Sequence, residues 1–250
     1  MRKINILGVD VDNLTMTETV DLIDSSIKNG KRIHQVAVNA FIFVLLEQDQ
    51  KVKESIINAN LINGDGQSVV WASKLLGSPL KERVAGIDLM GELMKLSHTN
   101  NYKVFLFGAE QEVIEKVVDV YSKMFSPNLI AGFRNGYYLD SQEDEIAREI
   151  GESGAHFLFV AMGSPKKELF LYKYKDILKT PYIMGVGGSF DVIAGKVKRA
   201  PLWMQKAGLE WFYRFLQEPR RMWKRYLVTN SLFTYYVLNS LLRKAFRTID

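Results

Sequence analysis

Residues 155–165, AHFLFVAMGSP, and residues 181–195, PYIMGVGGSFDVIAG, each join a short apolar run to a loop of small residues. An apolar run of this length that ends in glycine is typical of a strand buried on both faces of a parallel sheet. YKVFLFGA, residues 102–109, repeats the arrangement, and segments with helical composition separate the runs. These helices are expected over residues 111–124, 141–153 and 166–178. Strands that alternate with helices predict a parallel α/β sheet with right-handed crossovers.

The first hundred residues carry the same alternation less clearly. KINILGV, residues 3–9, predicts one short strand, and Thr15 with Glu18 has the spacing of a capping box at the start of a helix that runs to Ile27. HQVAVNA, residues 34–40, predicts a second strand. The remaining expected elements are a helical pair over 41–59, a strand or turn over 59–66, a helix over 67–77, a loop over 79–83, a helix from about Asp88 and a strand with a turn over 128–138.

Charge divides the chain into two parts. The last 55 residues hold 12 Lys and Arg against three acidic residues, a net charge of +9, whereas the first 195 hold 21 against 25, a net of −4. We therefore expect a Rossmann-like α/β domain over residues 1–195, with a mostly parallel sheet flanked by helices, and a basic, aromatic helical appendage over residues 196–250. Such asymmetry points to a nucleic acid or an anionic membrane surface as partner.

The appendage is expected to form two helices, because Pro219 cannot continue the first and suits the first turn of the second. Arg220, Arg221, Lys224 and Arg225 have offsets that place them on one helical face. Two interpretations stay open: an amphipathic helix packed on the body, or an aromatic and basic helix in a membrane interface. The apolar stretch from Tyr226 to Leu242 is interrupted by Asn and Ser residues, so no transmembrane span is expected.

Several patterns argue against other chemistry. The chain has no Cys, which excludes disulfides and thiolate metal sites, and the apolar run before Asp10 is too short for a signal peptide, so a cytoplasmic location is expected. The three histidines lack metal-ligand spacing. Asp10 and Asp12 form a DxD pattern that two carboxylates on one strand face could use for a divalent metal, but carboxylates at a strand exit are also common.

Ligands of parallel sheets bind at the carboxyl ends of the strands. Three predicted strand ends carry small-residue loops: FGA at residues 107–109, MGSPKK at 162–167 and GVGGSFD at 185–191. Small residues let a phosphate-bearing ligand approach the backbone closely, so a nucleotide or sugar-nucleotide pocket is expected there. No dinucleotide fingerprint or Walker motif is present.

Asp65 lies between two glycines in LINGDGQ, residues 61–67. Asp-Gly is a turn dipeptide, so the residue has a structural interpretation as well as a catalytic one. From this stretch alone, the structural turn is the favoured interpretation.

Three longer segments together resemble the WecG/TagA/CpsF family of bacterial glycosyltransferases: residues 63–89, 159–168 and 185–201. The order and spacing match from GVDVDNLT, which begins at Gly8, to LEWFYRFLQEPRR, which ends at Arg221. The resemblance implies an inverting, metal-independent transfer from a UDP-sugar donor, N-acetylmannosamine or a related hexose, to a polyprenyl-diphosphate-linked acceptor. It also implies a peripheral protein on the inner face of the cell membrane, acting in teichoic acid, capsule or exopolysaccharide synthesis without a cofactor.

The resemblance also assigns roles to single residues. Asp65 takes the position of the family's proposed base, and Arg214 and Arg221 match arginines brought over the site by the appendage. The third family arginine falls near Lys224 and Arg225, and Asn39 and Arg83 are expected to position sugar or base. The expected UDP-sugar pocket comprises Gly108, Ala109, Gly163, Lys166, Lys167, Gly185, Gly187, Gly188, Asp191, Lys224 and Arg225. For Asp191 a helix cap or a buried ion pair is an equal alternative.

The chain departs from the family pattern at Ala37, Phe41 and Lys167, where the family often has Thr, Glu and Gln. These departures leave a non-catalytic scaffold for lipid-linked glycan or membrane as the alternative function. A nucleic-acid-binding protein is disfavoured because the body is acidic and carries no recognition fold. The apolar tail is expected to pack on its own body, on a second subunit or on lipid.

Overall fold

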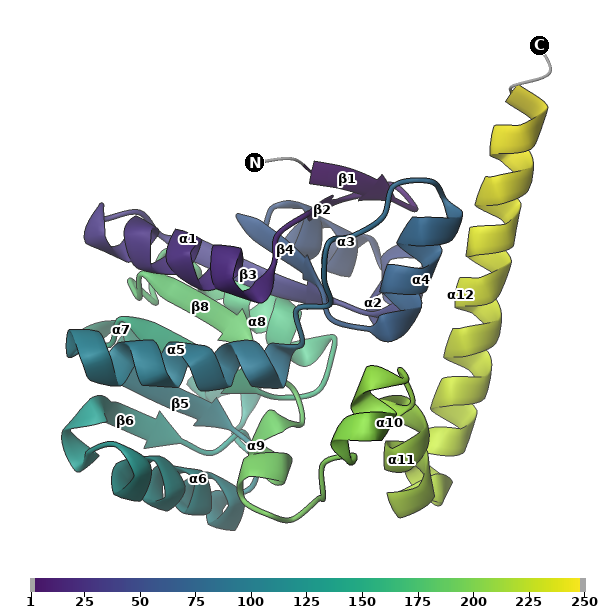
Figure 1. Cartoon of the computed structure of the whole chain (residues 1–250). Coiled ribbons are helices and arrows are strands. Elements are labelled where there is room, and N and C mark those ends of the chain that lie inside the picture. Colours follow the sequence, from purple (N-terminus) through teal and green to yellow (C-terminus); the bar gives the residue numbers. More distant parts are fainter. Residues whose placement is uncertain (1–2, 248–250) are drawn as a thin grey trace.

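The computed structural model describes residues 3–247, and its central element is a six-stranded parallel sheet (Figure 1). The strand order is β4-β3-β8-β7-β5-β6. The strands are β3 (Ile33–Val38), β4 (Leu61–Gly64), β5 (Val104–Gly108), β6 (Ile130–Arg134), β7 (Phe157–Ala161) and β8 (Tyr182–Gly185). The predicted α/β fold is confirmed, because every pairing in this sheet is parallel and helices connect its strands.

Helices cover both faces of the sheet. One layer contains α1 (Met16–Lys28), α5 (Gly86–Asn100) and α6 (Gln111–Met124), and the other contains α2 (Ala40–Gln48), α3 (Gln50–Ile57), α7 (Glu143–Glu152) and α8 (Lys166–Tyr174) (Figure 1). Alternate side chains of β5 supply both cores: Val104 and Leu106 pack with the first layer, Phe105 and Phe107 with α7 and α8. Helix α4 (Gln67–Leu75) follows β4, and the short α9 (Ser189–Ile193) follows β8. Single turns at Pro127–Leu129 and Asp140–Gln142 complete the body.

Local sequence signals set several element ends. The predicted capping box is present, because Thr15 Oγ1 accepts from the Glu18 amide at 3.2 Å and Glu18 Oε2 accepts from the Thr15 amide at 2.8 Å. The prediction of a single strand over residues 3–9 is wrong in its extent. Leu7 and Gly8 have φ of 48° and 84°, so the chain turns there and forms an antiparallel hairpin of β1 (Lys3–Ile6) and β2 (Val9–Asp12) outside the main sheet.

The appendage consists of α10 (Leu202–Lys206), α11 (Glu210–Gln217) and the 29-residue α12 (Pro219–Arg247). The predicted break at Pro219 is confirmed, with the proline at the first position of α12. Helix α12 lies along α2 and α4 at one edge of the body (Figure 1), where the ring of Phe233 packs 5.6 Å from that of Phe43. Within residues 3–247 we find no helix that joins the length and the apolar character needed to cross a bilayer. Residues 1–2 of the expected α/β domain and residues 248–250 of the expected appendage lie outside the described residues.

Candidate active site

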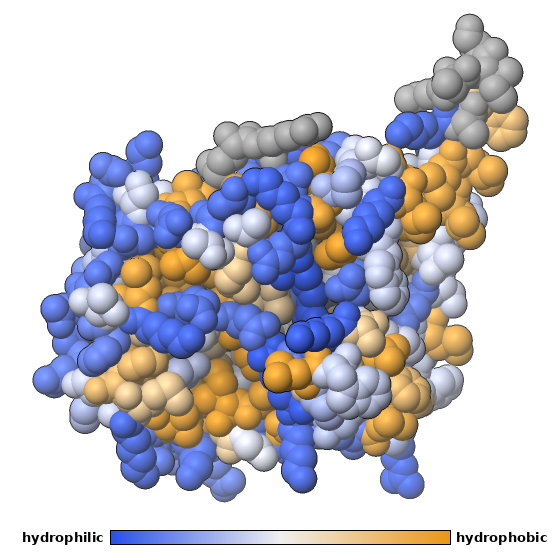
Figure 2. All heavy atoms as spheres, viewed as in Figure 1, coloured by the Kyte–Doolittle hydropathy of each residue, from blue (hydrophilic) through white to orange (hydrophobic). Residues whose placement is uncertain are grey.

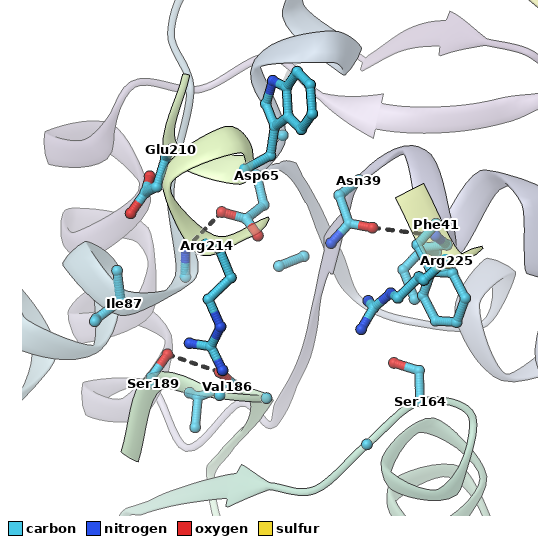
Figure 3. A pocket seen from close by; sticks show the side chains of 18 of the residues that line it. Asn39, Phe41, Asp65, Ile87, Ser164, Val186, Ser189, Glu210, Arg214 and Arg225 are labelled. Carbon is cyan, nitrogen blue, oxygen red and sulfur yellow. Dashed lines mark hydrogen bonds between the residues drawn. The ribbon is translucent and has the colours of Figure 1, made fainter. Parts of the chain in front are cut away.

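A cavity of about 840 Å³ lies where the carboxyl ends of the central strands meet the appendage. The body contributes the loops after β3, β4, β7 and β8, and the appendage contributes α11 and the first half of α12. Figure 3 shows side chains from both parts around one space, with Asp65 and Asn39 on the body side and Arg214 and Arg225 on the appendage side. The arrangement agrees with the rule that parallel sheets bind ligands at their carboxyl ends.

Asp65 is the first residue after β4, and three hydrogen bonds hold it. Its amide donates to the Val38 carbonyl at 2.9 Å, its carboxylate Oδ1 accepts from the Gly86 amide at 3.0 Å, and its carbonyl accepts from Arg83 Nε at 2.6 Å. The residue therefore shapes its turn and also lines the cavity. The structural and catalytic interpretations of Asp65 are compatible, because different atoms serve them.

The surroundings of Asp65 make its carboxylate easier to protonate than an exposed one. Burial raises the pKa of this carboxyl group, and Glu210 and Asp88 act in the same direction, while Arg83 and the Gly86 amide oppose the rise. A carboxylate with a raised pKa is a stronger proton acceptor than an ordinary surface aspartate. The local field is thus of the kind found around general bases.

Asn39 lies directly after β3, beside the Asp65 turn. Its Oδ1 accepts from the Ile42 amide at 3.2 Å and so caps α2, while its side-chain nitrogen faces the cavity (Figure 3). A Cβ on Gly66 would lie 3.1 Å from the Cβ of Asn39, so glycine is what allows the two strand ends to approach. Asn39 thus combines a structural cap with a donor directed at the site.

The appendage brings three arginines to the cavity. Arg214 Nε and Arg221 Nη1 both pair with Glu218, at 2.5 and 2.6 Å. The guanidinium of Arg225 lies 4.1 Å from the ring centre of Phe41, a cation–π contact. Burial lowers the pKa of Arg225, and the charges of Arg221 and Arg214 lower it further. Glu218 pairs with two of the three arginines and Arg225 contacts a ring instead, so arginines outnumber their carboxylate partners in this cluster.

The loop after β8 faces this cluster. A Cβ on Gly188 would lie 3.6 Å from Nη2 of Arg214, and Asp191, in the first turn of α9, lines the same wall. Figure 3 shows Arg214 reaching from the appendage toward Val186 and Ser189. Arg214 thus lies against the glycine loop, and an anion bound beside both would meet backbone amides and a guanidinium.

Lys167 also lines the cavity. The aliphatic part of its side chain packs against Gly185, and its amino group is hydrogen-bonded to Ser164 and Glu168. Its charge is therefore already paired with a buried carboxylate. Ala37 and Phe41, the other departures from the family pattern, also line the cavity. At Phe41, where the family often has Glu, the ring contacts the guanidinium of Arg225.

Most of the sequence-predicted site residues line the cavity, and three do not. Those that do are Asn39, Asp65, Arg83, Ala109, Gly163, Lys167, Gly185, Gly187, Gly188, Asp191, Arg214, Arg221 and Arg225. Gly108 lies outside the lining because its role is packing: a Cβ there would lie 2.4 Å from the Ala161 carbonyl. Lys166 turns to the Tyr138 ring, 3.8 Å from its centre, and Lys224 projects to solvent from the outer side of α12.

The sequence reasoning missed Glu210, Glu218, Ser164 and Tyr226, which also line the cavity. A signal for Glu218 existed, because it lies four residues after Arg214 and three before Arg221, the spacing of helical ion pairs. Nothing in the sequence indicates that Glu210 pairs with Arg83, 127 residues away.

The DxD pattern does not converge on the cavity. Asp10 accepts from Asn5 Nδ2 at 2.8 Å across the hairpin, and the buried Asp12 accepts from the Ile62 amide at 2.9 Å. These partners give both carboxylates structural roles. Among residues 3–247, no group of three or more His, Asp or Glu is arranged to hold a metal ion.

Comparison with known proteins agrees with this geometry. The profile of the glycosyl transferase WecG/TagA/CpsF family matches residues 4–247. N-acetylglucosaminyldiphosphoundecaprenol N-acetyl-beta-D-mannosaminyltransferases of Staphylococcus aureus strains MW2 and NCTC 8325 / PS 47 are each 37% identical over 225 residues, covering 89% of this chain and 86% of the relative. The protein therefore belongs to the WecG/TagA/CpsF family of glycosyl transferases.

Proposed function

We propose that the protein transfers an N-acetylmannosaminyl group from a UDP donor to a GlcNAc unit on a polyprenyl diphosphate. The acceptor hydroxyl oxygen attacks the anomeric carbon as its proton passes to Asp65, and the bond from that carbon to the diphosphate breaks. UDP leaves with the bonding electron pair, and one displacement inverts the anomeric centre. The donor class, metal independence and inversion follow from the family resemblance, and the acceptor and sugar follow from the names of the Staphylococcus relatives.

One observation carries the proposal: a carboxylate with a raised pKa and a cluster of arginines line a single cavity. Glycosyl transfer from a nucleotide donor needs both, a base at the nucleophile and positive charge at the leaving group. Asp65 supplies the first. Arg214, Arg221 and Arg225 supply the second, so the reaction needs no resident cofactor.

The cavity also has room to order the donor. The glycine loop at residues 185–188 and the Gly163–Ser164 turn would accept the nucleotide close to the backbone, with Asp191 beside it. The sugar would then lie between the arginines and Asp65, near Asn39. Fixed donors in a partly enclosed space stabilise developing charge better than mobile water does.

We further propose that the appendage binds the inner face of an anionic membrane, where a lipid-linked acceptor resides. The outer side of α12 exposes a row of large apolar side chains away from the body: Trp223, Leu227, Val228, Tyr235, Leu238, Leu242 and Phe246. Figure 2 shows apolar atoms along the upper part of this helix. The exposed Arg220 and Lys224 lie near the start of this row, and a mixed basic and apolar helix face is typical of interfacial binding.

The test is a UDP-release assay over a panel of UDP-sugars, with and without a polyprenyl-diphosphate-GlcNAc analogue. We expect acceptor-stimulated release from UDP-N-acetylmannosamine, and a fall of about 10³-fold in Asp65→Asn, which keeps an oxygen for the Gly86 amide but cannot take the proton. Asp49→Asn, at the cap of α3, is the matched control. Stimulated release that survives Asp65→Asn would move the base elsewhere, and binding of donor without release would support the scaffold alternative.

A further inference from the structure

A chain of ionic contacts joins the appendage to the residue proposed as base. Arg83 bonds two partners: Nε donates to the Asp65 carbonyl at 2.6 Å, and Nη2 pairs with Glu210 at 2.6 Å. Glu210 is the first residue of α11, so it belongs to the appendage, whereas Arg83 and Asp65 belong to the body. The side chains of Arg83 and Glu210 are only 21% and 26% exposed, so solvent screens the pair less than a surface ion pair.

Arg199 extends the chain on the far side of Glu210. Its Nε lies 3.3 Å from Glu210 Oε1, and its two terminal nitrogens bond both oxygens of Asp88 at 2.6 and 2.7 Å. A bidentate arginine–carboxylate pair fixes orientation as well as distance. Arg199 lies in the linker before α10 and Asp88 in the first turn of α5, so the linker holds Glu210 in one place against the body.

The Asp65 turn depends on this arrangement. Arg83 holds the Asp65 carbonyl, and three residues later the Gly86 amide holds the Asp65 carboxylate. Without Glu210, the guanidinium of Arg83 would lose its ion-pair partner while still acting on the charge of the Asp65 carboxylate. That side chain would then be drawn away from the cavity and held in its ionised form.

We infer that Glu210 is a positioning residue that holds Arg83 away from the Asp65 carboxylate. The base is therefore placed correctly only when the appendage is seated on the body. The inference rests on the proposed role of Asp65. It assigns the appendage a second task besides supplying arginines to the leaving group.

The charges that face Asp65 make the effect of Glu210 measurable. Burial raises the pKa of Asp65, Arg83 lowers it, and Glu210 and Asp88 raise it, while Arg199 pairs with both of those carboxylates. Glu210→Gln removes one negative charge and frees Arg83, and both changes lower the pKa of Asp65. Removing the charge of Glu210 lowers this pKa even without a change at Arg83, so positioning is read from a loss of kcat at unchanged KM and from the absence of that loss in an Arg83→Lys background.

The experiment follows the Asp65 carboxyl carbon by NMR in the full chain labelled with ¹³C-aspartate, with the signal assigned by its absence in Asp65→Asn. In Glu210→Gln we expect the titration midpoint of Asp65 to move to lower pH, and the acid limb of the pH profile of kcat/KM to move with it. The kcat at the optimum should fall about tenfold while KM for the donor stays within about twofold, because a misplaced base affects chemistry more than binding.

Four further variants sharpen the test. Glu92→Gln breaks an exposed ion pair with Lys95 on α5 and should change neither the Asp65 titration midpoint nor kcat. Glu210→Asp restores the charge and should recover the Asp65 midpoint. The double variant Arg83→Lys/Glu210→Gln should have the same kcat as Arg83→Lys alone, because Glu210 acts through the Arg83 guanidinium.

An unchanged Asp65 midpoint in a folded Glu210→Gln protein would overturn the inference and leave Glu210 as a docking contact. The NMR titration reads this outcome without turnover. A wild-type chain that shows no acceptor-stimulated release would count against the proposed function, whereas the midpoint comparison would still decide the contact between Glu210 and Asp65.

Discussion

Asp65 and Arg214 line the same cavity, and they reach it by different means (Figure 3). Asp65 follows a sheet strand, and its amide, carbonyl and carboxylate are all hydrogen-bonded to the body. Arg214 is on an eight-residue helix with no buried residue of its own, and Glu218, four residues on, is its ion-pair partner. The body wall is therefore set by the sheet, whereas the appendage wall depends on how α11 and α12 seat.

This difference assigns the two walls different tasks. A base must lie within hydrogen-bond reach of one proton, so a rigid backbone suits it. Arginines that neutralise a diphosphate act over several ångströms and must let UDP leave, so long side chains on a separable element suit them. Substitutions in the appendage and in the body should therefore have different effects.

The largest effect is expected from removing residues 196–250. Turnover should become undetectable, because the leaving group loses every appendage arginine. The body should stay folded with a lower melting temperature, since α12 covers Phe43 and closes the core beside α2. Exposing that ring costs about 2 kcal/mol, or about 5 °C in a domain of this size. UDP release and thermal unfolding would measure both, and full activity in the truncated protein would refute a catalytic appendage.

Arg214→Ala should lower kcat/KM about 10²-fold, the scale of losing one fixed donor to a developing charge. Arg214→Lys should recover only part of it, because an ammonium cannot replace the guanidinium fork. Arg220→Ala is the matched control, since Arg220 is exposed and outside the cavity lining. Equal losses in the two alanine variants would mean that general charge on the appendage matters, rather than the cavity wall.

Leu238→Ser tests the outer side of α12, where this leucine is 54% exposed. Partition into anionic vesicles should weaken about tenfold, as expected for losing one apolar side chain from a membrane interface. Ile57→Ser, at a 50% exposed position on α3 in the body, should leave partition unchanged. Sedimentation with vesicles measures both, and equal partition of Leu238→Ser and wild type would show that another surface binds the lipid.

The smallest effect concerns stability and its sign. Burial raises the pKa of Asp65 in the folded protein, so ionising this carboxyl group costs folding free energy once the pH exceeds its unfolded pKa, near 4. We expect Asp65→Asn to melt about 1–3 °C above wild type at pH 7, and the gain to vanish below about pH 4. Glu218→Gln, in the appendage, should instead lower the melting temperature, because it leaves Arg214 and Arg221 without their carboxylate. A destabilised Asp65→Asn would contradict the electrostatic cost assigned to the body wall.

Much of the fold is encoded in short segments. The apolar runs before FGA, MGSPKK and GVGGSFD predicted three buried parallel strands, and the structure contains them as β5, β7 and β8. The Thr15–Glu18 capping box and the break at Pro219 were equally readable, because each depends on residues a few positions apart. The turn at Leu7 and Gly8 was missed, since the apolar pattern of the segment continues across it.

By itself, the sequence determined the α/β alternation, the strand-end loops that line the cavity and the basic appendage, because these depend on local periodicity and composition. Only the tertiary structure decided which appendage charges face the site. Arg220, Arg221, Lys224 and Arg225 are neighbours on one helix, yet Arg221 and Arg225 line the cavity while Arg220 and Lys224 do not. Their orientation follows from the packing of Phe233 on Phe43, and the Arg83–Glu210 pair likewise joins residues 127 positions apart. Such contacts depend on how distant elements dock, and no local pattern encodes that.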